Sequence, residues 1–383
     1  MSNLQDNGVT VRVDGVDRVF RGSIGPFSSD NLGAHAIGGF TESFSSLRIC
    51  RVCMATVDDI QHLFKEEMFQ LRTCEMHNRH CQLVAGDPTL SSVYGVKRSS
   101  ILNKSRYFHV IDGLDLDIMH DQLEGVLPLE IKMLIRRLVQ EHREISLELI
   151  NERIANFNYG QVDQKNKPSP LKQQIFSSDT ASISQTATQM WCLARMFPLI
   201  VGDLIPDNDI NWENFLKLLK IEEIVFAPTC SVKLAAYLAV LVEEYLEQFT
   251  KNYDRRVIPK QHFMVHYPTQ IIRRGPLVQN WSMRFEAKHN YFKKLVDTIN
   301  NFKNVDYSLA RRHQALQAYL QQSGGGFYKV SMEQGPGKET TVNASFGDRL
   351  SALDDGITGD TKVTVMSWVK IFGTYYSEGC VIV

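Results

Sequence analysis

The chain has 383 residues, of which 43% are apolar. This length and composition predict a folded protein with two or three domains, or one large domain with an insertion. Its 42 Lys and Arg nearly balance its 43 Asp and Glu, so the whole molecule has no charge bias toward nucleic acid.

No run reaches the roughly 18 apolar residues that are needed to cross a bilayer. The N-terminus lacks a signal-peptide pattern, and seven scattered cysteines do not indicate a disulfide framework. We therefore expect a soluble, intracellular protein, nuclear or cytoplasmic, without a membrane partner.

In chain order, the first predicted element is a β-hairpin over residues 9–24. The stretch "VTVRVDGVDRVFRGSI" alternates around Asp14-Gly15, and Asp-Gly is typical of hairpin turns. We expect the second strand to run on toward Phe27, so that Asp30 lies just after a strand end. The stretch "SDNLGAH" is then either a polar turn or a carboxylate placed to bind a metal ion.

Helical spacing of apolar residues dominates the middle of the chain. We expect helices over residues 58–72, 127–150, 182–205, 231–251 and 280–301. Ser231 is a plausible N-cap, and residues 160–179 are polar enough for an exposed connection. After residue 323 a Gly-rich stretch leads to residues 361–383, which are expected to form a short β unit. The predicted fold class is α+β, mostly α.

The most specific local signal is a cysteine pair followed by a histidine pair. Cys50 and Cys53 form "CRVC", and His77 and His80 follow in "HNRHC". Structural zinc is commonly bound by two such short-spaced pairs in a tetrahedron. We therefore predict a structural zinc site on these four residues, with Cys81 as a substitute ligand. The other interpretation is a buried cysteine pair and unrelated exposed histidines.

Two charged segments carry further candidates. In "GLDLDIMHDQLEGV", Asp117 and His120 are three residues apart and would lie near each other on a helical turn, although an acidic helix start alone would also explain this stretch. Residues 251–320 hold thirteen Lys and Arg against four acids, with interleaved aromatic residues. Such a composition is typical of grooves that follow nucleic-acid phosphates, and a solvated basic helix is the alternative. Glu286, one of the four acids, either pairs with a neighbouring base or binds a metal ion.

Several of these stretches occur in an order that resembles a known family. They are "SDNLGAHAIGGFTESFS", "CRVC", "HNRHC", "DGLDLDIMHDQLEGVLPLEIK", "QMWCLARMFPLIVGDLIP", "QHFMVHYPTQIIRRGPL" and "WSMRFEAKHNYFK". From about residue 10 to about residue 320 they resemble transposases and transposase-derived proteins of the CACTA (En/Spm) group of animal genomes. Each stretch alone is weak, and the specificity lies in their number and order.

The resemblance implies an RNase H-like catalytic core with a DDE triad, whose carboxylates hold two Mg²⁺ ions for DNA cleavage and strand transfer. Asp30 takes the place of the second acid and Glu286 that of the third, and Asp117-x-x-His120 matches the family's D-x-x-H motif. The cysteine and histidine pairs become the zinc site of a large helical insertion. The residues expected to contact DNA are Arg273, Arg274, Arg284, Lys288, Lys293 and Lys294.

The implied organisation has four parts. Residues 1–54 are a partial RNase H-like core, and residues 55–250 are the zinc-containing helical insertion. Residues 251–322 are a basic helical segment that returns to the core, and residues 323–383 are a Gly-rich linker with a small β tail.

One departure from the family bears on activity. In the family the first carboxylate of the triad lies on an earlier core strand, whereas this sequence begins only 29 residues before Asp30. We therefore expect an incomplete RNase H-like core and a transposase-derived protein that lacks the ancestral activity. The alternatives are a domesticated DNA- or protein-binding module without catalysis, and an unrelated helical interaction protein. DNA is the expected partner, and a homo-oligomer is left open.

Overall fold

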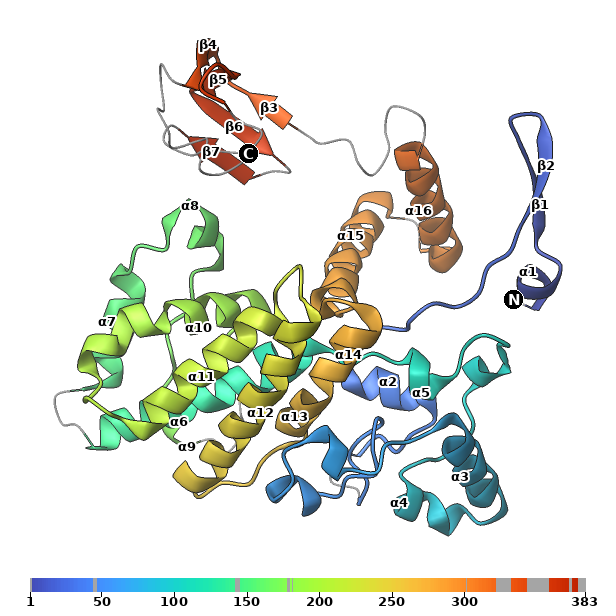
Figure 1. Cartoon of the computed structure of the whole chain (residues 1–383), viewed down its shortest axis with the longest axis horizontal. Coiled ribbons are helices and arrows are strands. Elements are labelled where there is room, and N and C mark those ends of the chain that lie inside the picture. The colour runs from blue at the N-terminus through green and yellow to red at the C-terminus, as the bar shows by residue number, and fades with distance from the viewer. Residues whose placement is uncertain are drawn as a thin grey trace. The chain divides into compact units, whose positions relative to one another are not determined.

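The computed structural model describes residues 2–43, 47–141, 145–177, 180, 182–300, 302–321, 332–342, 358–371 and 374–377. The chain divides into two compact units, Met1–Lys288 and His289–Val383. Among the described residues helices dominate, and the strands are short and antiparallel (Figure 1). The predicted α+β, mostly α class is confirmed at this level. No helix within the described ranges is both long and apolar enough to span a membrane.

The N-terminal hairpin forms where its turn signal predicts it. After a short helix α1 (Ser2–Asp6), β1 (Val9–Val13) pairs with β2 (Val16–Phe20). Asp14 and Gly15 both have positive φ, 51° and 79°, as the tight turn between two twisted strands requires.

The expectation that the second strand leads to Asp30 is wrong. Strand β2 ends at Phe20, and Phe27 makes only an isolated parallel bridge with Leu114. Asp30 instead begins the helix α2 (Asn31–Gly38) as its N-cap, because its carboxylate accepts a hydrogen bond from the Gly33 N–H at 2.5 Å. A Cβ atom at residue 33 would lie 2.4 Å from the Ser29 hydroxyl, so a side chain there would force Ser29 to move.

The helix expected over residues 58–72 is also wrong. This segment forms two short 3₁₀ turns, Asp59–Gln61 and Glu66–Met68. The Asp59 carboxylate accepts a hydrogen bond from the Thr56 N–H at 2.9 Å, and Glu66 accepts one from His266 at 2.7 Å. These contacts with the local turn and with a distant helix stand in place of continuous helical bonding.

Further helices of the first unit follow α2. They are α3 (Cys74–Gly86), α4 (Ser91–Tyr94), α5 (Val110–Gly113), α6 (Leu127–Glu141), α7 (Leu147–Asn156), α8 (Gly160–Asp163), α9 (Gln174–Ser177), α10 (Ala187–Val201), α11 (Ile210–Val225), α12 (Val232–Asn252), α13 (Pro259–Phe263) and α14 (Tyr267–Arg274). One π-helical segment, η5 (Met119–Val126), leads directly into α6. Further 3₁₀ turns are η3 (Pro88–Leu90), η4 (Ile101–Lys104), η6 (Gln164–Asn166), η7 (Gly202–Leu204), η8 (Met264–His266) and η9 (Leu277–Gln279).

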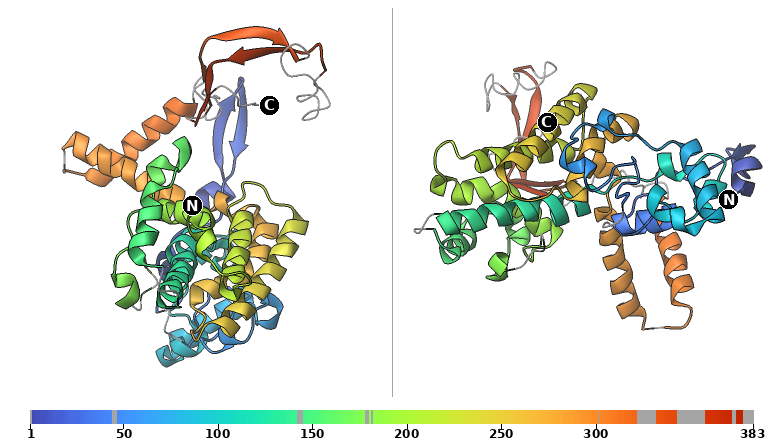
Figure 2. Two further views of the ribbon diagram at one scale, coloured as in Figure 1. Left: turned by 90° about the vertical axis from the view of Figure 1, so that its left-hand side faces the viewer. Right: turned by 90° about the horizontal axis from the view of Figure 1, so that it is seen from below.

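The main core lies where the apolar faces of α6, α10, α11 and α12 meet. Leu134, Phe197, Phe215, Leu238 and Phe249 contribute fully buried side chains to it. The views in Figures 1 and 2 agree that these helices run side by side. The predicted N-cap of α12 is confirmed, because Ser231 accepts a hydrogen bond from the Leu234 N–H at 3.2 Å.

The second unit holds the end of one helix, a second helix and the C-terminal strands. Helix α15 (Met283–Ile299) begins before the boundary between the units, and α16 (Val305–Gln321) follows it. A three-stranded sheet has the order β3 (Met332–Gln334), β6 (Trp368–Ile371), β7 (Thr374–Ser377). Strand β4 (Gly337–Thr341) pairs with β5 (Lys362–Met366). The expected short β unit after residue 361 is therefore present in the described residues.

Candidate metal centre and acidic site

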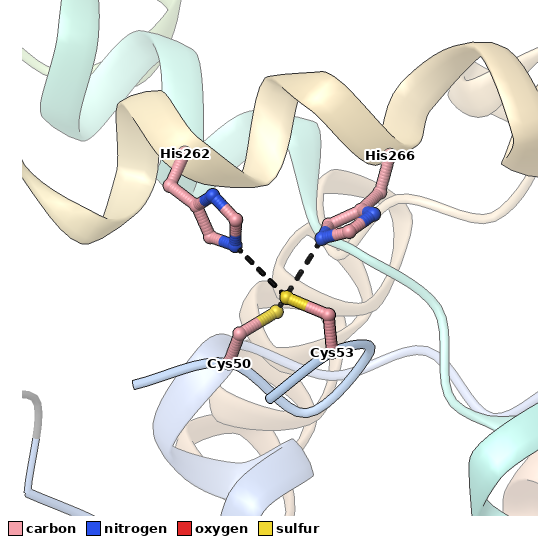
Figure 3. Close-up of side chains that lie close together, drawn as sticks. All are labelled: Cys50, Cys53, His262 and His266. Atoms are coloured by element: carbon pink, nitrogen blue, oxygen red, sulfur yellow. Dashed lines mark hydrogen bonds between the residues drawn. The ribbon is translucent and has the colours of Figure 1, made fainter. Parts of the chain in front are cut away.

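A buried group of two cysteines and two histidines forms a candidate metal centre. Cys50 and Cys53 lie on a loop near the N-terminus, and His262 and His266 lie on the continuous helical stretch of α13 and η8 (Figure 3). All four residues are buried, and their ligand atoms lie within 4.8 Å of one another. The loop is held from behind by Arg72, whose Nε donates to the carbonyls of Cys50 and Cys53 at 3.2 and 3.1 Å.

The donor distances fit a tetrahedral zinc ion. Ideal Zn–S and Zn–N bonds place sulfur and nitrogen about 3.6 Å apart. The Cys53 Sγ and His262 Nε2 atoms are 3.3 Å apart, and the Cys50 Sγ and His266 Nε2 atoms 3.6 Å. His266 also binds Glu66 through Nδ1 at 2.7 Å, and such carboxylate contacts orient histidine ligands in zinc sites. The structure therefore supports the expectation of zinc in part, because it contains a buried group that could hold such a metal.

Without an ion, Cys50 and His266 favour each other's charged forms. Burial raises the pKa of the Cys50 thiol, but the hydrogen bond from Cys53 and the charge of His266 outweigh burial and bring this pKa well below its usual value. Burial lowers the pKa of His266, whereas Cys50 and Glu66 raise it to about 9. The shift favours the thiolate of Cys50, the form in which cysteine binds metals. His266, and Cys53, whose thiol pKa burial raises, must each lose a proton before they bind an ion.

The assignment of His77 and His80 as the second ligand pair is corrected. Both lie on α3, but His77 packs in the smaller core with its ring 5.2 Å from that of Phe40. His80 stacks on Tyr94 at 4.1 Å, and the substitute ligand Cys81 lies beside His77. The sequence signal that points to the histidines beside the cysteine pair is the four-residue spacing of His262 and His266 in "QHFMVHYPTQ", which puts both on one helix face.

The D-x-x-H pair forms the centre of a second polar site. Asp117 Oδ1 accepts a hydrogen bond from the Ser282 N–H at 2.9 Å, and Oδ2 accepts one from the Ser282 hydroxyl at 2.6 Å. Oδ2 also receives a short bond from His120 Nδ1. Ser282 directly precedes α15, and its carbonyl accepts the N–H of Glu286 at 3.0 Å. Asp117 therefore fixes the start of the helix that carries Glu286.

His120 lies between carboxylates. Its Nε2 atom is 3.5 Å from Glu286 Oε1 and 3.7 Å from Glu124 Oε2. Burial disfavours the charged imidazolium, but the bond to Asp117 and the surrounding carboxylates raise its pKa above the ordinary histidine value. Burial raises the pKa of Asp117, but the hydrogen bonds from His120 and Ser282 outweigh burial and hold this pKa below its usual value.

Asp30 reaches the same region from the N-terminal side. It is exposed, and with Leu32, His120, Pro259 and Lys260 it lines a cavity of about 360 Å³. Both predicted acids thus lie near His120, because Asp30 lines the same cavity and Glu286 lies beside the imidazole ring. Sequence reasoning missed Ser282, which nothing in its local pattern distinguishes from an ordinary helix start.

The basic residues expected to contact DNA differ in how free they are. Arg274 is mostly buried in an ion pair with Asp115, and the exposed Arg273 lies 3.8 Å from Asp112. Exposed side chains remain at Arg284, Lys293 and Lys294, while Lys288 is half-buried.

No family model matches this sequence, and no curated protein gives a significant match to it.

Proposed function

We propose that this chain is a transposase-derived protein of the CACTA type that binds duplex DNA and has lost the ancestral DNA cleavage and strand transfer. The observation that carries the proposal is the convergence around His120. Asp30, the D-x-x-H pair and Glu286 come from three distant parts of the sequence, and all three contribute side chains there. A buried Cys₂His₂ group accompanies them in the same unit. We also propose an incomplete RNase H-like core with a helical insertion.

The contacts within the acidic site support the proposed loss of catalysis. Among the described residues, Cys50, Cys53, His262 and His266 form the one group of three or more ligand side chains close enough to share an ion. Asp117 already binds Ser282 and His120. Burial lowers the pKa of His120, but Asp117 and the nearby carboxylates raise it, which favours the imidazolium, and an imidazolium repels a divalent cation. Two-metal phosphoryl transfer needs carboxylates that are free to bridge two ions.

The proposal of DNA binding rests on the exposed bases of α15. Lys293 and Lys294 are neighbours on this helix and their side chains are exposed. Phosphate contacts of this kind release counterions, so binding weakens steeply with salt.

Binding of the full chain to fluorescent duplex DNA, measured by anisotropy over a range of KCl concentrations, tests this part. We expect affinity to fall with salt, and the double variant Lys293→Glu/Lys294→Glu to bind at least about tenfold more weakly. Lys165→Glu/Lys172→Glu, which reverses two exposed lysines elsewhere, is the matched control and should bind as the native protein does. Binding that does not depend on salt, or equal losses in both variants, would contradict the proposal.

Cleavage of supercoiled plasmid in Mg²⁺ or Mn²⁺ tests the loss of activity. We expect no cleavage above a metal-free control. Metal-dependent cleavage that disappears in Asp30→Asn and in Glu286→Gln would show that the acidic site is a working nuclease centre.

A further inference from the structure

A buried carboxylate that belongs to neither site joins the metal centre to the acidic site. Asp121 is fully buried in η5, next to His120. Its Oδ1 atom accepts a hydrogen bond from the Asn31 side chain at 2.6 Å, and its Oδ2 atom accepts one from the Tyr267 hydroxyl at 3.0 Å. Asn31 is the first residue of α2, directly after Asp30.

Both segments that carry the metal ligands reach this carboxylate. Arg51 lies between Cys50 and Cys53, and its Nη1 atom donates to Asn31 Oδ1 at 2.9 Å. Tyr267 directly follows His266 and donates to Asp121 itself. The cysteine side therefore reaches Asp121 through Asn31, and the histidine side reaches it directly.

The side chains of this network are buried and hydrogen-bonded to one another. Arg51, Asn31 and Tyr267 are all buried, with exposed fractions of 2%, 5% and 0%. Arg51 Nη2 also donates to the Asp115 carbonyl, and Gln122 donates to the Tyr267 hydroxyl at 3.0 Å. Hydrogen bonds between buried polar groups are costly to break one by one, so the network favours one arrangement of its segments.

We propose that Asp121 is a positioning residue that transmits the order of the metal centre to the acidic site. When an ion joins the cysteine loop to the histidine helix, Arg51 and Tyr267 are fixed relative to each other. Asp121 and Asn31 then fix the first turn of α2, which places Asp30, and the start of η5, which places His120. The inference rests on the proposed function in two respects only: the Cys₂His₂ group binds a metal ion, and the acidic residues around His120 form one site.

The test measures local order rather than activity. The full chain is loaded with Co²⁺, whose visible spectrum reports the geometry and number of Cys and His ligands. Hydrogen exchange and mass spectrometry then follow the backbone of α2. The variants are Asp121→Ala and the milder Tyr267→Phe.

Tyr245→Phe is the matched control. Tyr245 is also fully buried, donates from its hydroxyl to the buried Glu130 at 3.1 Å and accepts from Gln261 at 3.2 Å. Like the Tyr267 hydroxyl, the Tyr245 hydroxyl thus donates to a buried carboxylate and accepts from a glutamine. Among the hydrogen bonds described, it makes none to α2 or Arg51.

We expect the same cobalt spectrum in all variants. Asp121→Ala should speed exchange in the first turn of α2 by roughly tenfold, Tyr267→Phe less, and Tyr245→Phe not at all. Removal of the metal should speed exchange of this turn in the native chain, and should add little in Asp121→Ala.

Unchanged exchange in α2 of cobalt-loaded Asp121→Ala would overturn the proposal, as would equal effects of metal removal with and without Asp121. If Asp121→Ala does not fold, the comparison of Tyr267→Phe with Tyr245→Phe decides. Equal hydrogen exchange of α2 in these two variants would reject the proposal. If metal removal unfolds the native chain, the cobalt-loaded comparison decides. Failure of the proposed function is seen separately, as absent DNA binding in the native chain.

Discussion

At the residue scale, the identity of the metal ligands shows how far spacing alone can be trusted. The cysteine pair Cys50 and Cys53, predicted from the sequence, belongs to the buried group that could hold a metal ion, because a two-residue gap lets one short turn present both thiols. Their histidine partners lie 209 and 216 residues further on. A short-range pattern favours the nearer pair, His77 and His80, because it contains no information on which segments pack together.

Ligand replacement checks this assignment. We expect His262→Ala and His266→Ala each to reduce the metal content of the purified protein well below about one zinc per chain, because structural sites need all four ligands. His77→Ala and His80→Ala serve as controls and should retain it. Elemental analysis makes the measurement, and loss of zinc in the controls alone would restore the assignment made from the sequence.

A second residue-scale prediction concerns the buried carboxyl of Glu130. Burial raises its pKa to about 8, although the Tyr245 hydroxyl lowers it somewhat, against about 4.3 in an unfolded chain. The folded state holds the proton of Glu130 more tightly than the unfolded chain does. The stability that Glu130 contributes is therefore fully present below about pH 4 and is lost as the pH rises through about 8.

Glu130→Gln should therefore flatten the fall in stability between pH 5 and pH 8. Burial also raises the pKa of Asp115 to about 6 and of Asp121 to about 7, so part of the slope should remain. Thermal unfolding of both proteins across this range makes the comparison. Parallel curves would indicate that Glu130 is not protonated in the folded protein.

At the scale of elements, apolar periodicity predicts the long helices and fails for a segment with strong tertiary contacts. Helices α6, α10 and α12 form in segments expected to be helical, because each buries one apolar face in the main core. The segment 127–150, expected as one helix, is instead divided, because α6 ends at Glu141 and α7 begins at Leu147. Residues 58–72 have similar spacing but contribute Glu66 to His266. Asp30 likewise caps a helix instead of ending a strand, since Asp is as suitable for an N-cap as for a turn.

The start of α15 gives a prediction at this scale. No side chain of α15 is fully buried, and only the half-buried Met283 of its first turn packs against the main core, so the attachment of this turn depends largely on Ser282 and the carboxylate of Asp117. Ser282→Ala leaves that buried carboxylate without one donor and should cost about 1–3 kcal/mol. Urea unfolding measures the loss.

Ser231→Ala, which removes the N-cap of α12, is the comparison and should cost about 1 kcal/mol. Exchange of the backbone of the first turn of α15 should rise only in Ser282→Ala. A native exchange rate there would mean that other contacts hold the helix.

At the scale of the whole molecule, the metal centre joins parts of the first unit that are far apart in the sequence. A cross-link between residues some 210 positions apart restricts the unfolded chain and stabilises the fold. Removal of the metal with a strong chelator should lower the midpoint of thermal unfolding by on the order of 10 °C. Differential scanning fluorimetry makes the measurement, with His77→Ala as a metal-binding control. An unchanged midpoint in demonstrably metal-free protein would contradict a structural role.

The sequence alone determined the helical class, the N-terminal hairpin, the cap at Ser231 and the cysteine half of the metal centre. Each of these depends on residues within one or two turns of each other, and local spacing carries that information. Only the tertiary structure decided that His262 and His266 face the cysteines, that Ser282 anchors α15 and that Asp121 joins the two sites. Those contacts depend on which helices pack together, which is set by the summed burial of many side chains. The quoted stretch "SDNLGAH" is thus a helix start that carries an acid, and its neighbours become visible only in the folded chain.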